Sequence, residues 1–236
     1  MNKKDFDAIV VGSGPNGLSA AITLQRAGLS VLVLEAKSTV GGGLRTEELT
    51  LPGFQHDVCS AIHPMAVASP FFQSLPLKDF GLQFIDPPLA AAHPFDDGTA
   101  AILSRSMEET TQLLGIDRST YIRLIVPVMQ AWPSIVNDVL SPLRMPKHPL
   151  LMAEFGVKAM RSAQALGGIF KEKQARGLWA GMAAHSIQPL SNATTSAIAL
   201  VLMAVGHMQG WPMPKGGSRS IANYMEIGRA SCRERV

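Results

Sequence analysis

Three glycines near the N-terminus have the spacing G-x-G-x-x-G, at Gly12, Gly14 and Gly17. They follow the apolar run 8–11 and open a stretch with helical apolar spacing, so the context is strand, tight turn and helix. In such a turn the first glycine allows the bend, the second lets the backbone approach a pyrophosphate, and the third lets helix and strand pack closely. Amides at the helix N-terminus would hydrogen-bond the pyrophosphate, and proline is tolerated there. We therefore expect a dinucleotide phosphate site that consists of Gly12, Gly14, Pro15, Asn16 and Gly17.

An acidic residue ends the next apolar run. Glu35 follows residues 31–34 and lies 18 residues after the last glycine of the turn. A carboxylate at this position accepts hydrogen bonds from the ribose hydroxyls of an adenosine group and disfavours a 2′-phosphate. We assign Glu35 and the neighbouring Ala36 to the adenosine side of the site. A glycine-rich turn in another kind of α/β domain is the alternative interpretation.

A second glycine cluster, at 41–43, follows shortly after the acidic residue and leads into Leu44 and Arg45. A nicotinamide-binding domain has no evident need for it. Closely packed glycine amides favour an anion, and an arginine adds charge-assisted hydrogen bonds to it. The alternative is a glycine-rich surface loop with a solvated Arg45.

The sequence from Gly41 onward, GGGLRTEELTLPGFQHDVCSAIHP, together with the first motif, resembles the two-dinucleotide-binding-domain flavoproteins. Within them it is most similar to the phytoene-desaturase-like FAD-dependent oxidoreductases, whose superfamily also holds the amine oxidases. The resemblance implies that FAD is the cofactor and that Gly42 and Gly43 bring the backbone against its pyrophosphate and ribityl chain. It also implies that Leu44 belongs to this loop and that Arg45 lies beside the flavin. The loop 40–46 would then be the second half of an FAD clamp.

The same resemblance implies an enzyme that dehydrogenates a small apolar substrate, such as a polyene or another isoprenoid, by hydride transfer to flavin. An amine-oxidase-like flavoenzyme and a non-catalytic lipid-binding escort on the same fold are the alternatives. No catalytic residue is assigned, and neither His56 nor His63 can be given a proton-transfer role from the sequence. Full-length members of this family continue well beyond these residues. We therefore expect an N-terminal portion that lacks the C-terminal half of its own chain and is inactive by itself.

The elements that would position these residues form an α/β fold. We expect a Rossmann-like FAD-binding domain with a parallel sheet at 1–105, a largely helical, incomplete substrate domain at 106–212, and a return segment toward the FAD domain at 213–226. The return segment holds Pro-Lys-Gly-Gly at 214–217, similar to a P-x-G-G segment of the resembling family. Short strands are expected at 83–85, 90–93 and 99–103, with a hairpin turn at Asp97 and Gly98. Helices are expected at 107–114, 119–140, 148–170, 173–184 and 194–207.

Hydrophobic residues make up 47% of the chain and charged residues 17%, which supports a buried core rather than disorder. The first apolar stretch ends at Gly12, and the longest apolar run, 197–205, is too short to cross a membrane. We expect a cytoplasmic protein and keep peripheral membrane contact through the 197–205 helix as an alternative to its burial in a core. The histidines are scattered without metal-ligand spacing, so we expect no metal site.

The last ten residues, IGRASCRERV, differ from the rest of the chain. They have no apolar period, and they back-translate in one frame into a common sequencing-library adapter. We therefore expect residues 227–236 to be an adapter artefact. Without them Lys+Arg falls from 21 to 18 and Asp+Glu from 18 to 17, so the net charge falls from +3 to +1. The indication of nucleic-acid binding that a basic chain gives then disappears, and Cys59 is the single cysteine.

Overall fold

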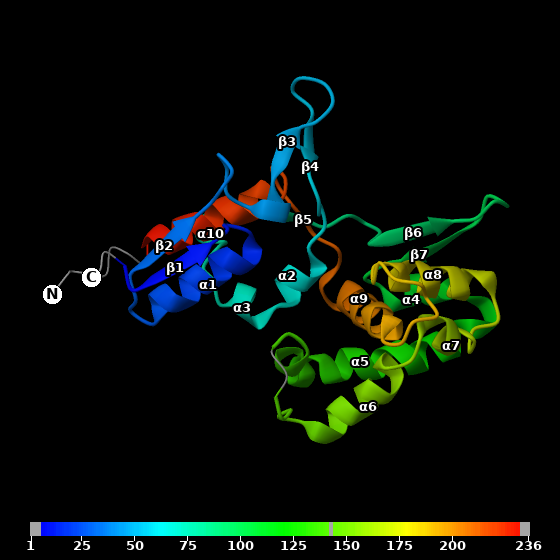
Figure 1. Ribbon diagram of the computed structural model, residues 1–236. Helices are drawn as coiled ribbons and strands as arrows, with labels where there is room; N and C mark the ends of the chain where they lie inside the picture. The colour runs from blue at the N-terminus through cyan, green and yellow to red at the C-terminus, as the bar shows by residue number, and fades with distance from the viewer. Residues whose placement is uncertain (1–5, 142–143, 232–236) are drawn as a thin grey trace. The chain divides into compact units, whose positions relative to one another are not determined.

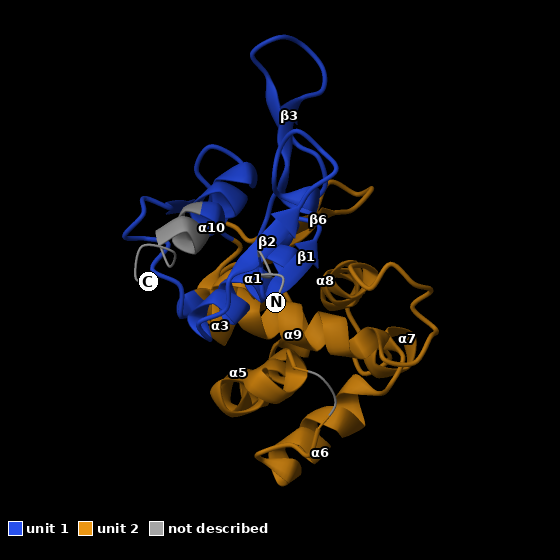
Figure 2. Ribbon diagram, turned by 60° about the vertical axis from the view of Figure 1, so that its left-hand side comes forward, with its two compact units in different colours: residues 1–63, 73–85, 212–236 blue, residues 64–72, 86–211 orange. Residues whose placement is uncertain are grey.

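The computed structural model describes residues 6–141 and 144–231, with side chains described up to residue 226. Residues 232–236 of the predicted adapter-coded tail, and the side chains of 227–231, lie outside the described part. The chain divides into two compact units, which Figure 2 shows in different colours. Unit 1 comprises residues 1–63, 73–85 and 212–236, and unit 2 comprises residues 64–72 and 86–211.

Unit 1 is built on a strand–helix–strand arrangement. Strands β1 (Ala8–Val11) and β2 (Val31–Leu34) pair in parallel, with each residue of β1 opposite the corresponding residue of β2. A parallel pair requires a crossover connection, and helix α1 (Pro15–Arg26) supplies it. The side chains that α1 buries are those of Leu18, Ala21 and Ile22. This is the arrangement that the glycine spacing and the two apolar runs predict.

Three further features complete unit 1. The 3₁₀ turn η1 (Gly42–Leu44) leads into an antiparallel hairpin of β3 (Thr46–Glu48) and β4 (Gln55–Asp57). Strands β5 (Phe84–Ile85) and β8 (Met213–Pro214) pair antiparallel and so join the chain after residue 212 to this unit. Helix α10 (Arg219–Ser231) then packs against α1, as Figure 1 shows. The segment 213–226 is therefore part of unit 1.

Unit 2 is mostly helical. Its helices are α2 (Pro64–Ala68), α4 (Met107–Gln112), α5 (Arg118–Val139), α6 (Pro149–Ala159), α7 (Ala163–Gly167), α8 (Lys173–Ala184) and α9 (Thr195–Gln209), with the 3₁₀ turn η2 (Gly115–Asp117). The short helix α3 (Pro70–Gln73) ends at the first residue that returns to unit 1. Helix α9 is the centre of unit 2, because it packs against α2, α5, α6, α7 and α8.

Helix α9 contains the apolar run 197–205, and its burial is confirmed. Leu200, Met203 and Val205 have no exposed surface, whereas Ile198 of the same run is 37% exposed. None of the helices that the structure describes is long and apolar enough to cross a bilayer. Most of the run is buried because the other helices of unit 2 pack against α9.

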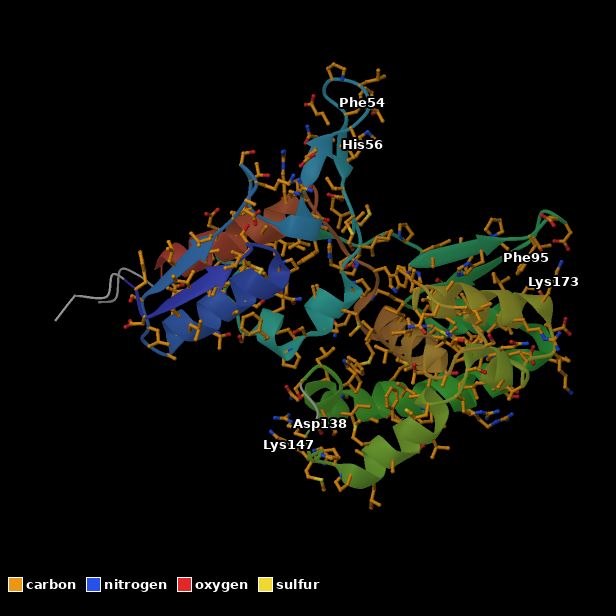
Figure 3. The ribbon with its side chains drawn as sticks, viewed as in Figure 1. Phe54, His56, Phe95, Asp138, Lys147 and Lys173 are labelled. Carbon is orange, nitrogen blue, oxygen red and sulfur yellow. The ribbon has the colours of Figure 1, made fainter. Side chains whose placement is uncertain are left out.

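The hairpin of β6 (Ala91–Pro94) and β7 (Ala100–Leu103) belongs to unit 2, whereas a domain boundary at residue 105 would place it with the FAD-binding residues. The hairpin packs against α8. Lys173 of α8 forms an ion pair with Asp97 in the hairpin turn, and its Nζ stands 5.4 Å from the centre of the Phe95 ring (Figure 3). These contacts are the physical reason that the hairpin joins the helical unit.

The prediction of one continuous helix over 148–170 is wrong. Helix α6 ends at Ala159, and α7 begins after Ser162, whose Oγ accepts a hydrogen bond from the Ala165 N–H at 3.1 Å. This serine is an N-cap, and the next N–H, of Ala163, donates to Thr195 Oγ1 on α9 at 2.8 Å. The other predicted helices are present with ends shifted by a few residues. Helices α2 and α3, each begun by a proline, lie where no helix was expected.

Candidate functional site

The first glycine turn joins β1 to α1. The Gly12 N–H donates to the Leu34 carbonyl at 2.7 Å, which continues the parallel pairing past the ends of the two strands. A Cβ at Gly17 would lie 2.0 Å from the Gly12 carbonyl oxygen. No larger residue fits there unless the helix moves away from the strand, because packing in such an interior leaves no spare volume. The geometry therefore gives Gly12 and Gly17 the two mechanical tasks that the spacing assigns to them.

The N-terminus of α1 offers amide groups to an anion. Gly14 is the N-cap, Pro15 is the first helical residue, and no described side chain caps this end. The first N–H groups of a helix have no acceptor within it, and the helix dipole makes that end positive. The first turn of α1 also carries no acidic side chain. The amides of Asn16 and Gly17 are thus suited to a phosphate group.

Ser13 and Glu35 are linked directly. The backbone N–H of Ser13 donates to Glu35 Oε2 at 2.8 Å, and its hydroxyl donates to the same oxygen at 2.6 Å. The Lys37 N–H donates to the other carboxylate oxygen at 2.9 Å. These bonds, the Ser13 hydroxyl first among them, lower the pKa of Glu35 from 4.5 to about 2, and the Ala36 backbone adds a small contribution. Glu35 is therefore ionised at neutral pH and held at the carboxyl end of β2, next to the glycine turn.

The second glycine loop lies directly on the first. The Gly41 N–H donates to the Ser13 carbonyl at 3.0 Å. Gly42 has a φ of +56°, and a Cβ on it would lie 3.0 Å from Gly14 Cα, so the two backbones touch where side chains would separate them. Leu44, at the end of η1, is buried beneath the loop. The two glycine clusters, separate in the sequence, thus form one surface at the N-terminus of α1.

Arg45 is anchored beside this surface. Its Nε donates to the Gly42 carbonyl at 3.0 Å, and its guanidinium pairs with Glu47 Oε1 at 3.0 Å. Only 26% of the Arg45 side chain is exposed. The arginine is therefore held over the glycine loop by a carbonyl and a carboxylate, unlike the freely solvated side chain of the alternative interpretation.

A hydrogen-bonded junction next to Arg45 joins three segments of the chain. The buried Thr46 hydroxyl donates to Asp57 Oδ1 at 2.6 Å, and the same oxygen accepts from the Ser218 N–H at 2.8 Å. The Arg219 N–H donates to Thr46 Oγ1 at 3.0 Å. The N-terminal end of α10 is thus attached to the base of the β3–β4 hairpin, one residue from Arg45.

His63 closes the other side of this junction. The Ser218 hydroxyl donates to the Ser60 carbonyl, so its oxygen accepts from the Nε2–H of His63 at 2.7 Å. The His63 N–H donates to the Pro212 carbonyl at 3.0 Å. Burial lowers the pKa of His63, partly opposed by the charge of Asp57, so the ring is neutral at neutral pH. The neutral ring thus joins the segment at His63 to Ser218 at the start of α10.

Sequence reasoning gave no role to Ser13 or Ser218, and it included Thr46 only as the last residue of the loop 40–46. Ser13 occupies a variable position of the glycine motif, and Ser218 lies 161 residues from its partner Asp57. The available signals were the polar pair at 56–57 and the Pro-Lys-Gly-Gly segment at 214–217, for which a return toward the FAD domain was expected but no partner residue. Within the described residues, no group of three or more His, Cys, Asp or Glu side chains is arranged to hold a metal ion.

Comparison with known proteins agrees with this geometry. Residues 10–75 match the NAD(P)-binding Rossmann-like domain family. Wild-type putrescine oxidase bound to putrescine has a similar fold, with a TM-score of 0.56 and 20% identity over 96% of this chain and 50% of that chain. The fold is Rossmann-like α/β, with a helical second unit. The solved structure therefore supports the fold assignment, and at this identity it supports only that.

Curated relatives match about half of the chain. A subunit of the limonene dehydrogenase of Castellaniella defragrans is 36% identical over 109 residues, which is 46% of this chain and 20% of that protein. Pyridine nucleotide-disulfide oxidoreductase domain-containing protein 2 of Mus musculus is 36% identical over 117 residues, which is 49% of this chain and 19% of that protein. The aligned part is thus about a fifth of the length of each of these relatives.

Proposed function

We propose that this chain is the FAD-binding, N-terminal portion of an FAD-dependent oxidoreductase. The observation that carries the proposal is the contact of the two glycine loops, Gly41 to Ser13 and Gly42 to Gly14, at the uncapped N-terminus of α1. A nicotinamide site needs only the first loop. Two loops with no Cβ atoms between them leave a backbone surface that a pyrophosphate and its ribityl extension can approach.

The residues present fit this cofactor. Glu35, ionised and fixed by Ser13, would accept hydrogen bonds from the adenosine ribose, and Ala36 would lie beside it. The α1 amides would bind the pyrophosphate, and Gly42, Gly43 and Leu44 would follow the ribityl chain. Arg45, held in place by the Gly42 carbonyl, would add a positive charge beside the flavin. Bound flavin would supply the acceptor for a hydride.

We propose an apolar substrate, such as an isoprenoid or another polyene, which the enzyme dehydrogenates. The support is the 36% identity over 109 residues to the limonene dehydrogenase subunit, whose name specifies a hydrocarbon substrate. Reaction at a carbon without a polar handle requires orientation by the cofactor site and an apolar pocket, rather than a metal or an acid–base pair. We also propose that a further C-terminal half of the chain supplies the remaining part of the substrate site. The same proposal includes a cytoplasmic location and no nucleic-acid partner.

The test is made on the protein purified as its gene encodes it. We expect the absorption bands of an oxidised flavin in the visible spectrum and release of FAD on denaturation. Anaerobic addition of a monoterpene or a longer polyene should bleach these bands, and putrescine should leave them unchanged. A folded preparation without flavin that cannot be reconstituted with FAD would overturn the cofactor assignment. Bleaching by putrescine alone would replace the apolar substrate with an amine.

A further inference from the structure

Helix α6 is apolar on the side that unit 2 buries. Leu151, Met152 and Phe155 pack against a cluster that includes Trp132 and Val205. Ala159, one turn beyond Phe155, is buried as well. These four residues form the side of α6 that packs against the rest of unit 2.

The opposite side of α6 is also apolar, and it is exposed. Leu150 is 86% exposed, Val157 73% and Met160, at the C-cap, 65%. With the exposed Ala153 they follow the spacing i, i+3, i+7 and i+10, which places them in one row along the helix. Met145, just before the helix, is 86% exposed. A surface helix normally carries polar residues on this side, and a helix that is apolar all round normally has something covering it.

Basic residues accompany the row. Residues 144–161 contain Arg144, Lys147, Lys158 and Arg161 and a single acid, Glu154, so their net charge is +3. Glu154 pairs with Lys158 at 3.3 Å on the helix. The exposed row therefore lies within a segment that is both apolar and positively charged.

Residues 144–147, just before α6, are held to the end of α5. Asp138, near the end of α5, pairs with Arg144 at 3.1 Å and accepts the Lys147 N–H at 2.9 Å. Figure 3 shows Asp138 and Lys147 together at this end of unit 2. Arg144 thus forms an ion pair within the protein. Lys147 and Arg161, at the two ends of the helix, form no ion pair with any residue that the structure describes.

We propose that α6 and residues 144–147 form a docking surface for an anionic lipid bilayer. Met145, Leu150, Val157 and Met160 would enter the interface between headgroups and acyl chains, and the basic residues would contact lipid phosphates. Apolar residues beside Lys and Arg are the composition of interfacial helices. A second copy of this chain is a poorer occupant, because a twofold contact places α6 against α6 and so brings two positive segments together. The proposal does not depend on FAD binding.

Vesicle cosedimentation tests the proposal with the full protein. We compare vesicles of phosphatidylcholine alone with vesicles that also contain phosphatidylglycerol, at low and high salt. The protein should bind the anionic vesicles, and salt should weaken binding. Replacing two interfacial side chains, in Leu150→Ser/Val157→Ser, should weaken binding about tenfold or more. The matched control, Ile116→Ser/Ile187→Ser, changes side chains that are 65% and 92% exposed elsewhere in unit 2 and should bind as the wild type does.

A second variant keeps the test decisive if the serine variant does not fold. Lys147→Glu/Arg161→Glu alters only exposed charges and should lose the preference for anionic vesicles. Absence of wild-type binding, or equal binding by all variants, would overturn the proposal. A wild-type dimer in size-exclusion chromatography that Leu150→Ser/Val157→Ser converts to a monomer would assign the surface to self-association instead.

Discussion

Substitution of Thr46 is the sharpest test of the junction beside Arg45. Thr46→Val keeps the shape of the side chain and removes its hydroxyl. That hydroxyl donates to the carboxylate of Asp57 at 2.6 Å and accepts the Arg219 N–H at 3.0 Å. A hydrogen bond to a charged group contributes about 1.5–3 kcal/mol and a neutral one about 0.5–1.5 kcal/mol. Because Asp57 is only half-buried, we take the lower ends and expect a loss of about 2 kcal/mol.

Hydrogen exchange measured by mass spectrometry reports this loss where it occurs. About 2 kcal/mol corresponds to roughly 30-fold faster exchange in peptides that cover the start of α10, where Ser218 and Arg219 donate to the junction. Thr46→Ser keeps the hydroxyl and serves as the matched control, with exchange close to that of the wild type. Tryptophan fluorescence reports whether unit 2 keeps its fold in the variants, because Trp132, Trp179 and Trp211 all lie in unit 2. Equal exchange in wild type and Thr46→Val, or the same acceleration in both variants, would refute the reasoning.

Three other predictions follow from single contacts. Gly17→Ala places a Cβ 2.0 Å from the Gly12 carbonyl and should destabilise the fold by about 1–3 kcal/mol or more, measured by urea denaturation; unchanged stability would contradict the packing. The pKa of Glu35 is lowered from 4.5 to about 2, so its stabilising contribution is complete above pH 4.5 and is lost as the pH falls through about 2. Between pH 4.5 and about 2, the free energy of unfolding should depend less steeply on pH in Glu35→Gln than in the wild type. Equal pH dependence in the two proteins would contradict the assignment. Tyr121→Phe leaves the buried His207 Nε2 without its 2.7 Å hydrogen-bond partner and should cost about 1–3 kcal/mol in thermal unfolding; no change would mean that water replaces the hydroxyl.

The local part of the fold could be predicted because each signal lies within a short stretch of sequence. The tight turn at Gly12, the close packing at Gly17 and the parallel strands on either side depend on neighbours in the same unit of structure. The helices of unit 2 follow in the same way from apolar periods that end at prolines and glycines. The break before α7 was missed: its N-cap, Ser162, is a local signal, but the hydrogen bond of Ala163 to Thr195, 32 residues further along the chain, has no local signature.

The sequence allowed each of the two glycine loops to be predicted, but it did not predict that the loops touch and form one surface. Each glycine cluster indicates an anion by itself, but their contact depends on the Ser13 carbonyl, which any residue at that position would supply. The junction of Thr46, Asp57 and Ser218 also joins groups that are far apart in the sequence. No local pattern distinguishes an aspartate that will meet such partners from a solvated one. The hairpin at 91–103 shows the same limit, since its place in unit 2 depends on Lys173 and α8.

The most direct test of the central claim is a titration with FAD of two alanine variants. Gly42→Ala adds a Cβ 3.0 Å from Gly14 Cα, between the two glycine loops, at a φ of +56°. Gly53→Ala is the control, because its φ of +84° imposes comparable backbone strain in open space. The account predicts that Gly42→Ala weakens FAD binding about tenfold or more, whereas Gly53→Ala binds as the wild type does. Wild-type affinity in Gly42→Ala would contradict the claim that the two loops form one cofactor site.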